Sequence, residues 1–104
     1  MDNEFSKNIQ FIRDNLVDSE QMAGLAEEAT ELAHAALKLR RCIDGRNPTP
    51  VTETEAVKNL LEEVGDVLLC LKTLGFPTDF DDYSGDINSK LKRWVERLKE
   101  KFCE

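Results

Sequence analysis

The sequence predicts an all-α protein, a four-helix bundle-like single domain that spans residues 1–104. Hydrophobic residues recur at intervals of three and four positions in four segments, and no segment of useful length alternates with a period of two. Turn-forming and aromatic residues are too few for a β-sandwich or barrel, with 5 Gly, 3 Pro and 7% aromatic residues. A chain of this length buries only a modest core, so we expect it to be oligomeric.

The first two predicted helices are amphipathic. The first should end near Val17, and the second, capped by Ser19, should run for about 25 residues to Gly45. Pro48 and Pro50 prevent its continuation, because proline lacks a backbone N–H and constrains the residue before it. The residues that define these two apolar faces are Phe5, Ile9, Ile12 and Leu16, then Met22, Leu25, Ala26, Ala29, Leu32, Ala33, Ala36, Leu37 and Ile43.

The last two predicted helices follow this proline-containing segment. Thr52 and Glu55 form a capping-box pattern at the start of the third helix, and Gly75 and Pro77 end it. The stretch 78–85 is acidic and rich in turn formers, and the fourth helix follows it. The apolar faces are made by Val57, Leu60, Leu61, Val64, Leu68, Leu71 and Leu74, then by Ile87, Leu91, Trp94, Val95, Leu98 and Phe102, with Trp94 expected in the core.

The charge balance excludes several kinds of function. Twenty-one acidic and fourteen basic residues give a net charge of −7, which argues against binding to nucleic-acid polymers or anionic membranes. No apolar run approaches the roughly 20 residues of a membrane span, and the first residues lack the features of a signal peptide. The 3 cysteines are far apart and form no CxxC pair, so neither a disulfide framework nor a zinc site is indicated. We therefore expect a cytoplasmic protein.

One carboxylate pattern occurs twice. When residues 24–35 are placed over residues 59–70, an offset of 35, Glu28 falls on Glu63 and Glu31 falls on Asp66. Each pair lies on the flank of an apolar face, in the same helical phase. Two long helices joined by a short linker should pack antiparallel, so the four carboxylates can meet in one cleft. The alternative is a pair of solvated surfaces, because acidic pairs at this spacing also arise by chance in so acidic a chain.

Four converging carboxylates would repel one another unless a cation lies among them. Ligand sets made only of oxygen atoms favour Mg²⁺, with Mn²⁺ as a substitute, over zinc. Water and substrate phosphates would complete the coordination shell. The pattern taken alone is therefore typical either of a magnesium site or of two solvated acidic surfaces.

The double motif, Glu28-x-x-Glu31 followed after a proline-containing linker by Glu63-x-x-Asp66, resembles the signature of MazG-like nucleotide pyrophosphohydrolases, members of the all-α NTP pyrophosphatase superfamily. The resemblance covers residues 20–75 closely and the flanking helices loosely. It implies that these four residues hold Mg²⁺ and carry catalysis, with one of them as the base for the attacking water. The implied reaction cleaves a nucleoside triphosphate, NTP or dNTP, between the α and β phosphates to give the monophosphate and pyrophosphate.

The resemblance also implies the assembly and part of the substrate site. Homodimers or homotetramers are expected, and basic residues of the last helix should reach the triphosphate, with Lys90 and Arg93 nearest the helix start. The alternative for these two is a solvated stripe. Phe11 and Asn8 are candidate contacts to the base, although Phe11 is more simply explained by a subunit contact.

Several further residues have a structural interpretation. His34 is expected on the surface, Cys70 as a buried thiol, and Gly65 where another helix approaches closely. Two other functions stay open: hydrolysis of phosphoribosyl-ATP, and a non-catalytic helical module that binds a partner. The sequence leaves open the preferred base and sugar, the number of metal ions, the identity of the base, the choice between dimer and tetramer, and the pathway.

Overall fold

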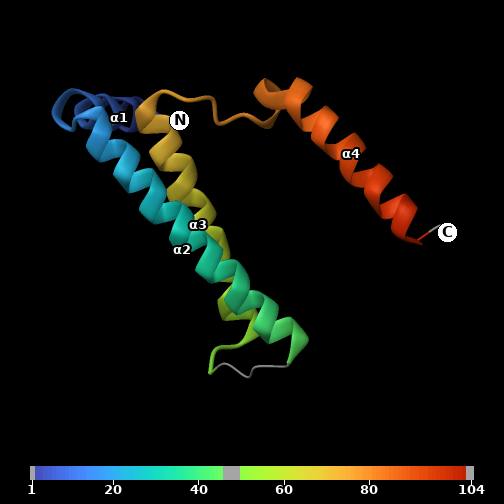
Figure 1. The fold of residues 1–104 in the computed structure, drawn as a ribbon. Coiled ribbons are helices and arrows are strands. Elements are labelled where there is room, and N and C mark those ends of the chain that lie inside the picture. The colour runs from blue at the N-terminus through green and yellow to red at the C-terminus, as the bar shows by residue number, and fades with distance from the viewer. Residues whose placement is uncertain (1, 46–49, 103–104) are drawn as a thin grey trace.

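The computed structural model describes residues 2–45 and 50–102. These residues form α-helices and one short 3₁₀ helix, with no strand among them, so the all-α prediction is confirmed (Figure 1). The elements in chain order are α1 (Asn3–Asn15), α2 (Asp18–Asp44), α3 (Glu53–Leu74), η1 (Phe80–Tyr83) and α4 (Ser84–Phe102).

The start of α2 differs from the prediction. The extended residue before the helix is Val17, with φ −66° and ψ 152°, so Ser19 lies inside the first turn and does not cap it. At the start of α1, the Asp2 side chain caps the helix and accepts a hydrogen bond of 2.9 Å from the Phe5 N–H. It ends at Asn15, two residues before the predicted Val17.

The other helix ends follow the local chemistry of the sequence. Gly45 and Gly75 adopt the left-handed conformation, with φ 68° and 84°, and end α2 and α3 where predicted. The Thr52 hydroxyl accepts a bond of 3.2 Å from the Glu55 N–H, which is the first half of the predicted capping box. Pro48 lies outside the described residues.

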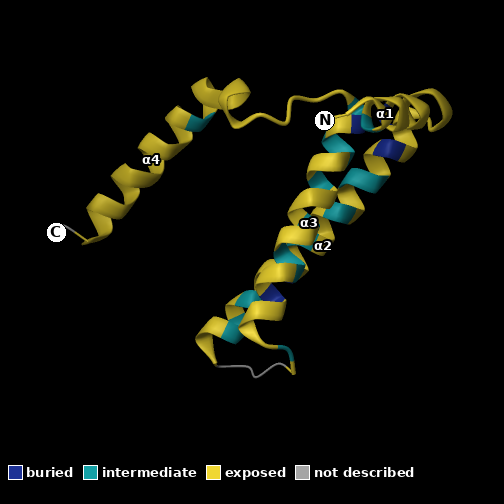
Figure 2. Ribbon diagram, turned by 180° about the vertical axis from the view of Figure 1, so that it is seen from behind, coloured by how far each residue is buried: buried dark blue, intermediate teal, exposed yellow. Residues whose placement is uncertain are grey.

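Helices α2 and α3 pack against each other as an antiparallel hairpin (Figure 1). Buried and half-buried residues follow the seam between them, whereas most of the remaining surface is exposed (Figure 2). Ala35 and Ala56 are the most buried apolar residues, with 2% and 1% of their surface exposed. Small side chains at these two positions allow the helix backbones to approach closely.

Helix α1 lies across the open end of the hairpin and is tied to the end of α3 by Arg13. The Arg13 guanidinium donates hydrogen bonds of 3.0 Å and 2.6 Å to the carbonyl oxygens of Thr73 and Lys72. A cation at this place also interacts favourably with the negative end of the helix dipole. Ile9 is the buried apolar residue of α1.

Helix α4 extends away from the other three helices, and its principal contact is with η1 (Figure 1). The Cα radius of gyration is 17.8 Å, compared with about 13 Å for a compact chain of this length. The single chain therefore does not form the expected four-helix bundle. The prediction that Trp94 lies in the core is wrong for the single chain, because 59% of this residue is exposed.

Two apolar stripes are left uncovered. We call them the α3 seam and the α4 seam, and most of their side chains are exposed. The α3 seam consists of Val57, Leu61, Val64 and Leu68, and the α4 seam of Ile87, Leu91, Trp94 and Leu98. Within the described ranges, no helix is both long enough and apolar enough to cross a membrane.

We predict that Arg13→Ala lowers the free energy of unfolding by about 1 kcal/mol, because two hydrogen bonds to the end of α3 are lost at a partly exposed site. Urea denaturation followed by helical circular dichroism measures the change. Lys7→Ala on the same helix removes the same charge without these bonds and should leave the midpoint unchanged. Equal midpoints for the Arg13 variant and the wild type would contradict the prediction.

Candidate metal centre

Three of the four predicted carboxylates meet between α2 and α3. Glu28 of α2 and Glu63 and Asp66 of α3 each offer an oxygen, and these oxygens all lie within 4.8 Å of one another. Glu28 and Glu63 are half-buried, whereas Asp66 is exposed. The convergence that the matched helical phase predicted is therefore found for three of the four carboxylates, and the cluster faces solvent at Asp66.

The register of the hairpin explains why these residues meet. Ala35 lies seven residues after Glu28, and Ala56 lies seven residues before Glu63. In an antiparallel pair, a register that places these two alanines opposite each other also places the two glutamates opposite each other. Seven residues are close to two helical turns, so the alanine pair and the glutamate pair both lie along the interface between α2 and α3.

Glu31 does not belong to this group of three. It is exposed on α2, one turn after Glu28, but its charge still acts on Glu63. Glu27 and Glu62 are exposed on the same two helices. The described residues therefore bring together a group of three carboxylates, with Glu31 outside it.

Glu63 is the member of the cluster whose negative charge is disfavoured by its surroundings. Its Oε2 atom is buried and has no hydrogen-bond partner among the residues that the structure describes. Partial burial, followed by the negative charges of Asp66, Glu28 and Glu31, raises the pKa of Glu63. A divalent cation among these oxygens would remove the repulsion and give the Oε2 atom a partner, so the donor set fits Mg²⁺ or Mn²⁺.

Two other polar residues, Gln21 and Cys70, lie along the interface between α2 and α3. Gln21 was not predicted from the sequence. Gln21 is only 5% exposed and donates a hydrogen bond of 2.7 Å to the Leu16 carbonyl. Its Oε1 atom is buried without a partner within residues 2–45 and 50–102. It lies seven residues before Glu28, a spacing that could have revealed it. Cys70, seven residues after Glu63, is half-buried, and its pKa is raised by burial and by the charges of Glu28 and Asp66, so the thiol stays protonated.

A cavity of about 510 Å³ opens next to this seam, between α1, α2 and α3. Asn8 is one of its lining residues, whereas Phe11 is not among them and has 65% of its surface exposed. The lining is mainly apolar, with Gln21, Cys70 and Thr73 among its polar groups. Of the two candidate base contacts, only Asn8 therefore lines this cavity.

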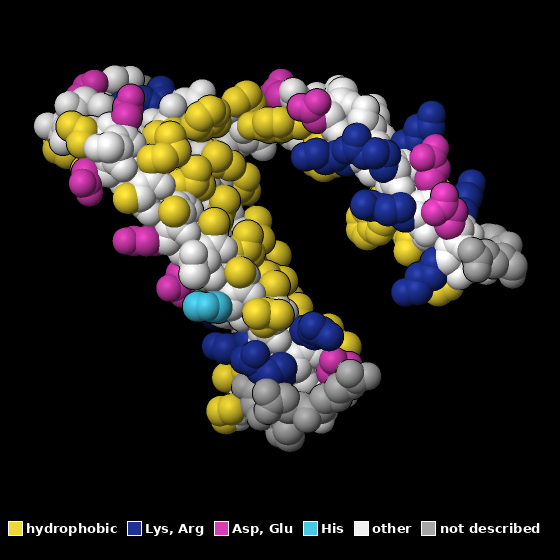
Figure 3. Space-filling view, viewed as in Figure 1, with side chains coloured by type: hydrophobic (Ala, Val, Ile, Leu, Met, Phe, Trp, Pro, Cys, Tyr) yellow, Lys and Arg dark blue, Asp and Glu magenta, His cyan; other side chains and the backbone are white. Residues whose placement is uncertain are grey.

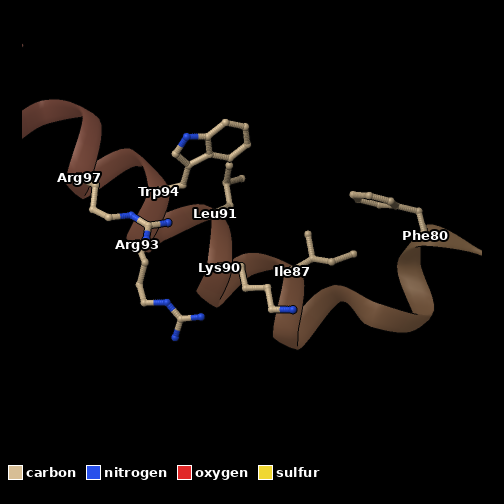
Figure 4. Close-up of a pocket in the computed structure, with 7 residues that line it drawn as sticks. All are labelled: Phe80, Ile87, Lys90, Leu91, Arg93, Trp94 and Arg97. Carbon is tan, nitrogen blue, oxygen red and sulfur yellow. The ribbon is translucent and has the colours of Figure 1, made fainter. Parts of the chain in front are cut away.

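The predicted phosphate contacts lie elsewhere in the single chain. Lys90 and Arg93 line a groove of about 650 Å³ on α4, together with Arg97. Figure 4 shows Ile87, Leu91 and Trp94 along one side of this groove, while Lys90 and Arg93 project along the other. The structure does not bring these basic side chains to the carboxylates.

Two smaller expectations have different outcomes. His34 is exposed, as expected. The expectation of a close helix approach at Gly65 is wrong for the described part of the chain, because a Cβ built there meets no described atom within 4 Å. Gly65 lies on the outer side of α3, near the uncovered α3 seam.

Comparisons of the chain with models of protein families, with curated proteins and with solved structures found no match.

We predict that the charged Glu63 side chain destabilises the folded, metal-free protein, and that this effect depends on pH. A carboxyl group whose pKa is higher in the folded than in the unfolded state binds more protons when folded, so stability falls as pH rises from about 4.5 through the raised pKa. Glu63→Gln should therefore unfold at a higher temperature than wild type at pH 7 in EDTA, and the difference should shrink toward pH 4. Thermal melts at several pH values test this, with Glu27→Gln on exposed α2 surface as the control. A pH-independent difference would contradict it.

Proposed function

We propose that this protein is a MazG-like, Mg²⁺-dependent nucleotide pyrophosphohydrolase that converts an NTP or dNTP to the monophosphate and pyrophosphate. The observation that carries the proposal is the meeting of Glu28, Glu63 and Asp66 with a buried, unpartnered Glu63 oxygen. The paired motif in the sequence supports the same activity. The proposal includes a cytoplasmic location and a homodimer or homotetramer.

In this proposal, each carboxylate residue has a stated role in catalysis. Glu28, Glu63 and Asp66, with Glu31 at the edge, would hold the cation, which supplies charge neutralisation for the phosphate oxygens and a more acidic water. One of the four carboxylates would accept the proton of the water that attacks the α-phosphorus. The exposed side of the cluster, at Asp66, leaves room for the phosphates to approach.

The first test is pyrophosphate release from the eight common NTPs and dNTPs, with Mg²⁺ and with EDTA. Wild type should release pyrophosphate only with Mg²⁺. Glu63→Gln should lower the rate by roughly 100-fold or more, because it removes one ligand charge from the metal centre. Glu27→Gln is the matched control and should keep most of the activity.

The outcomes separate the competing functions. Release lost in the Glu63 variant and in EDTA supports the proposal, and the profile across the panel identifies the preferred nucleotide. If none of the eight is cleaved, phosphoribosyl-ATP is the next substrate. Failure on that substrate too, with helical circular dichroism intact, would contradict an enzymatic function and favour the non-catalytic module.

The proposed cation site has a readout that does not need turnover. A ligand that binds only the folded state at 100 times its Kd stabilises that state by about 2.7 kcal/mol. Mg²⁺ should therefore raise the melting temperature of wild type, and raise that of Glu63→Gln much less. An equal rise in both proteins would show that the cation acts elsewhere.

Lys90 and Arg93 are proposed to bind the triphosphate, which requires an arrangement of α4 that the single chain does not have. Lys90→Ala should raise KM roughly tenfold or more with little change in helical content, because a charge-assisted hydrogen bond to phosphate is lost. Lys92→Ala, on the other edge of α4, is the matched control. An unchanged KM in the Lys90 variant would contradict the assignment.

A further inference from the structure

The cavity between α1, α2 and α3 has a polar side chain in its lining that takes no part in the proposed metal centre. Gln21 lines this cavity and is only 5% exposed. Its Oε1 atom is buried, and no described residue donates a hydrogen bond to it. An acceptor that has lost water without gaining a donor is unfavourable. A bound molecule that carries an N–H group would supply the donor that the described chain does not.

The orientation of the Gln21 amide is set by its nitrogen. The Nε2 atom donates a hydrogen bond of 2.7 Å to the Leu16 carbonyl, and a carbonyl can only accept. Leu16 is the residue that ends α1, where backbone carbonyl groups lack partners within the helix. The nitrogen is therefore engaged by the backbone, and the end of the amide left for a ligand is an acceptor.

The rest of the cavity suits a flat, uncharged group. Phe5, Ile9, Ile12 and Leu69 are among its apolar lining residues, and no Lys or Arg is among the described residues that line it. On the face drawn in Figure 3, hydrophobic side chains gather near the end of the hairpin that α1 crosses, whereas Lys and Arg lie mainly on α4 and toward the other end. A phosphate would find no cation here, and Glu20, another lining residue, would repel it. The volume of about 510 Å³ is ample for one aromatic base.

The cavity is close enough to the carboxylates for one molecule to reach both. Gln21 precedes Glu28 by seven residues on α2, which is a rise of about 10 Å along the helix. Cys70, which also lines the cavity, follows Asp66 by four residues on α3, a rise of about 6 Å. A nucleotide whose phosphates lie at Asp66 can therefore place its base in the cavity, because its sugar spans the distance between them.

A single free acceptor favours one class of base. Cytosine and adenine carry an exocyclic amino group, which donates, where uracil, thymine and guanine carry an oxygen, which accepts. In uracil and thymine the ring N–H lies between two carbonyl oxygens. An amide pairs well with that edge only when it donates to one of these oxygens while it accepts from the N–H. The nitrogen of Gln21 is engaged at Leu16, so this second bond is missing.

We propose that Gln21 is a specificity-determining residue whose Oε1 atom accepts a hydrogen bond from the exocyclic amino group of a cytosine or adenine base held in this cavity. The inference rests on the proposed function, because the phosphates of the same nucleotide lie at Glu28, Glu63 and Asp66. A base with an oxygen at that position leaves two acceptors facing each other without a donor. A site built to bond a polar group rejects such a substrate strongly.

Substrate pairs that differ at this group test the assignment. CTP is compared with UTP, and ATP with ITP, by pyrophosphate release in Mg²⁺. In the wild type, kcat/KM for the amino member of each pair should exceed that for the oxo member by roughly tenfold or more. In Gln21→Met, which removes the acceptor but keeps the length of the side chain, the ratio should fall to near one. A partial loss of folding changes both members equally and leaves the ratio intact.

A matched control is available on α1. Gln10 is an exposed amide that does not belong to the residues lining the cavity, so Gln10→Met should keep the wild-type ratios. Equal kcat/KM within both pairs in the wild type would overturn the inference and leave the pyrophosphohydrolase proposal standing. An unchanged preference in Gln21→Met would do the same, because another group would then select the base.

A binding measurement tests the inference without turnover. In ¹⁵N-labelled wild type in EDTA, the Gln21 side-chain amide signal is identified by its absence from the spectrum of Gln21→Met. Cytidine, which has no phosphate, should shift this signal, and uridine at the same concentration should not. Equal shifts with both nucleosides, or a shift with neither, would overturn the inference whether or not the protein cleaves any nucleotide.

Discussion

The candidate site depends on the register in which α2 packs against α3. Ala35 and Ala56 are almost completely buried in the seam, and their small side chains let the two backbones approach closely. Because each alanine lies seven residues from a glutamate, the same register brings Glu28 opposite Glu63. A shift of one residue would rotate a side chain by about 100° around its helix and separate the carboxylates. Packing two turns away therefore sets the geometry of the cluster.

The same register creates a conflict between charge and burial. Glu28 and Glu63 occupy positions that the hairpin would otherwise fill with apolar side chains, and burial together with mutual repulsion raises the pKa of Glu63. Gln21, two helical turns before Glu28, adds another buried oxygen that has no partner in the described part of the chain. A divalent cation among the carboxylates would relieve the first of these costs, so cation binding and stability of the hairpin are expected to be linked.

Features set by local chemistry could be predicted from the sequence, and features set by distant parts of the chain could not. The ends at Gly45 and Gly75 and the cap at Thr52 depend on a few neighbouring residues, and they were predicted correctly. Ser19 was assigned a capping role wrongly, because the cap depends on which residue becomes extended. The meeting of Glu28 with Glu63 followed from helical phase, whereas phase alone did not show that Glu31 stays outside the cluster.

Helix α4 shows the same distinction at a larger scale. Its spacing identified an apolar face, but the sequence does not say which surface covers that face, and the core position expected for Trp94 assumed a bundle within one chain. Most of the stability of a helix in a protein comes from the packing of its amphipathic face, so the folding of this 19-residue helix and its packing are linked. The α4 seam and the edge with Lys90 and Arg93 lie side by side on this helix (Figure 4). The surface that buries the seam therefore also determines where these two basic side chains point.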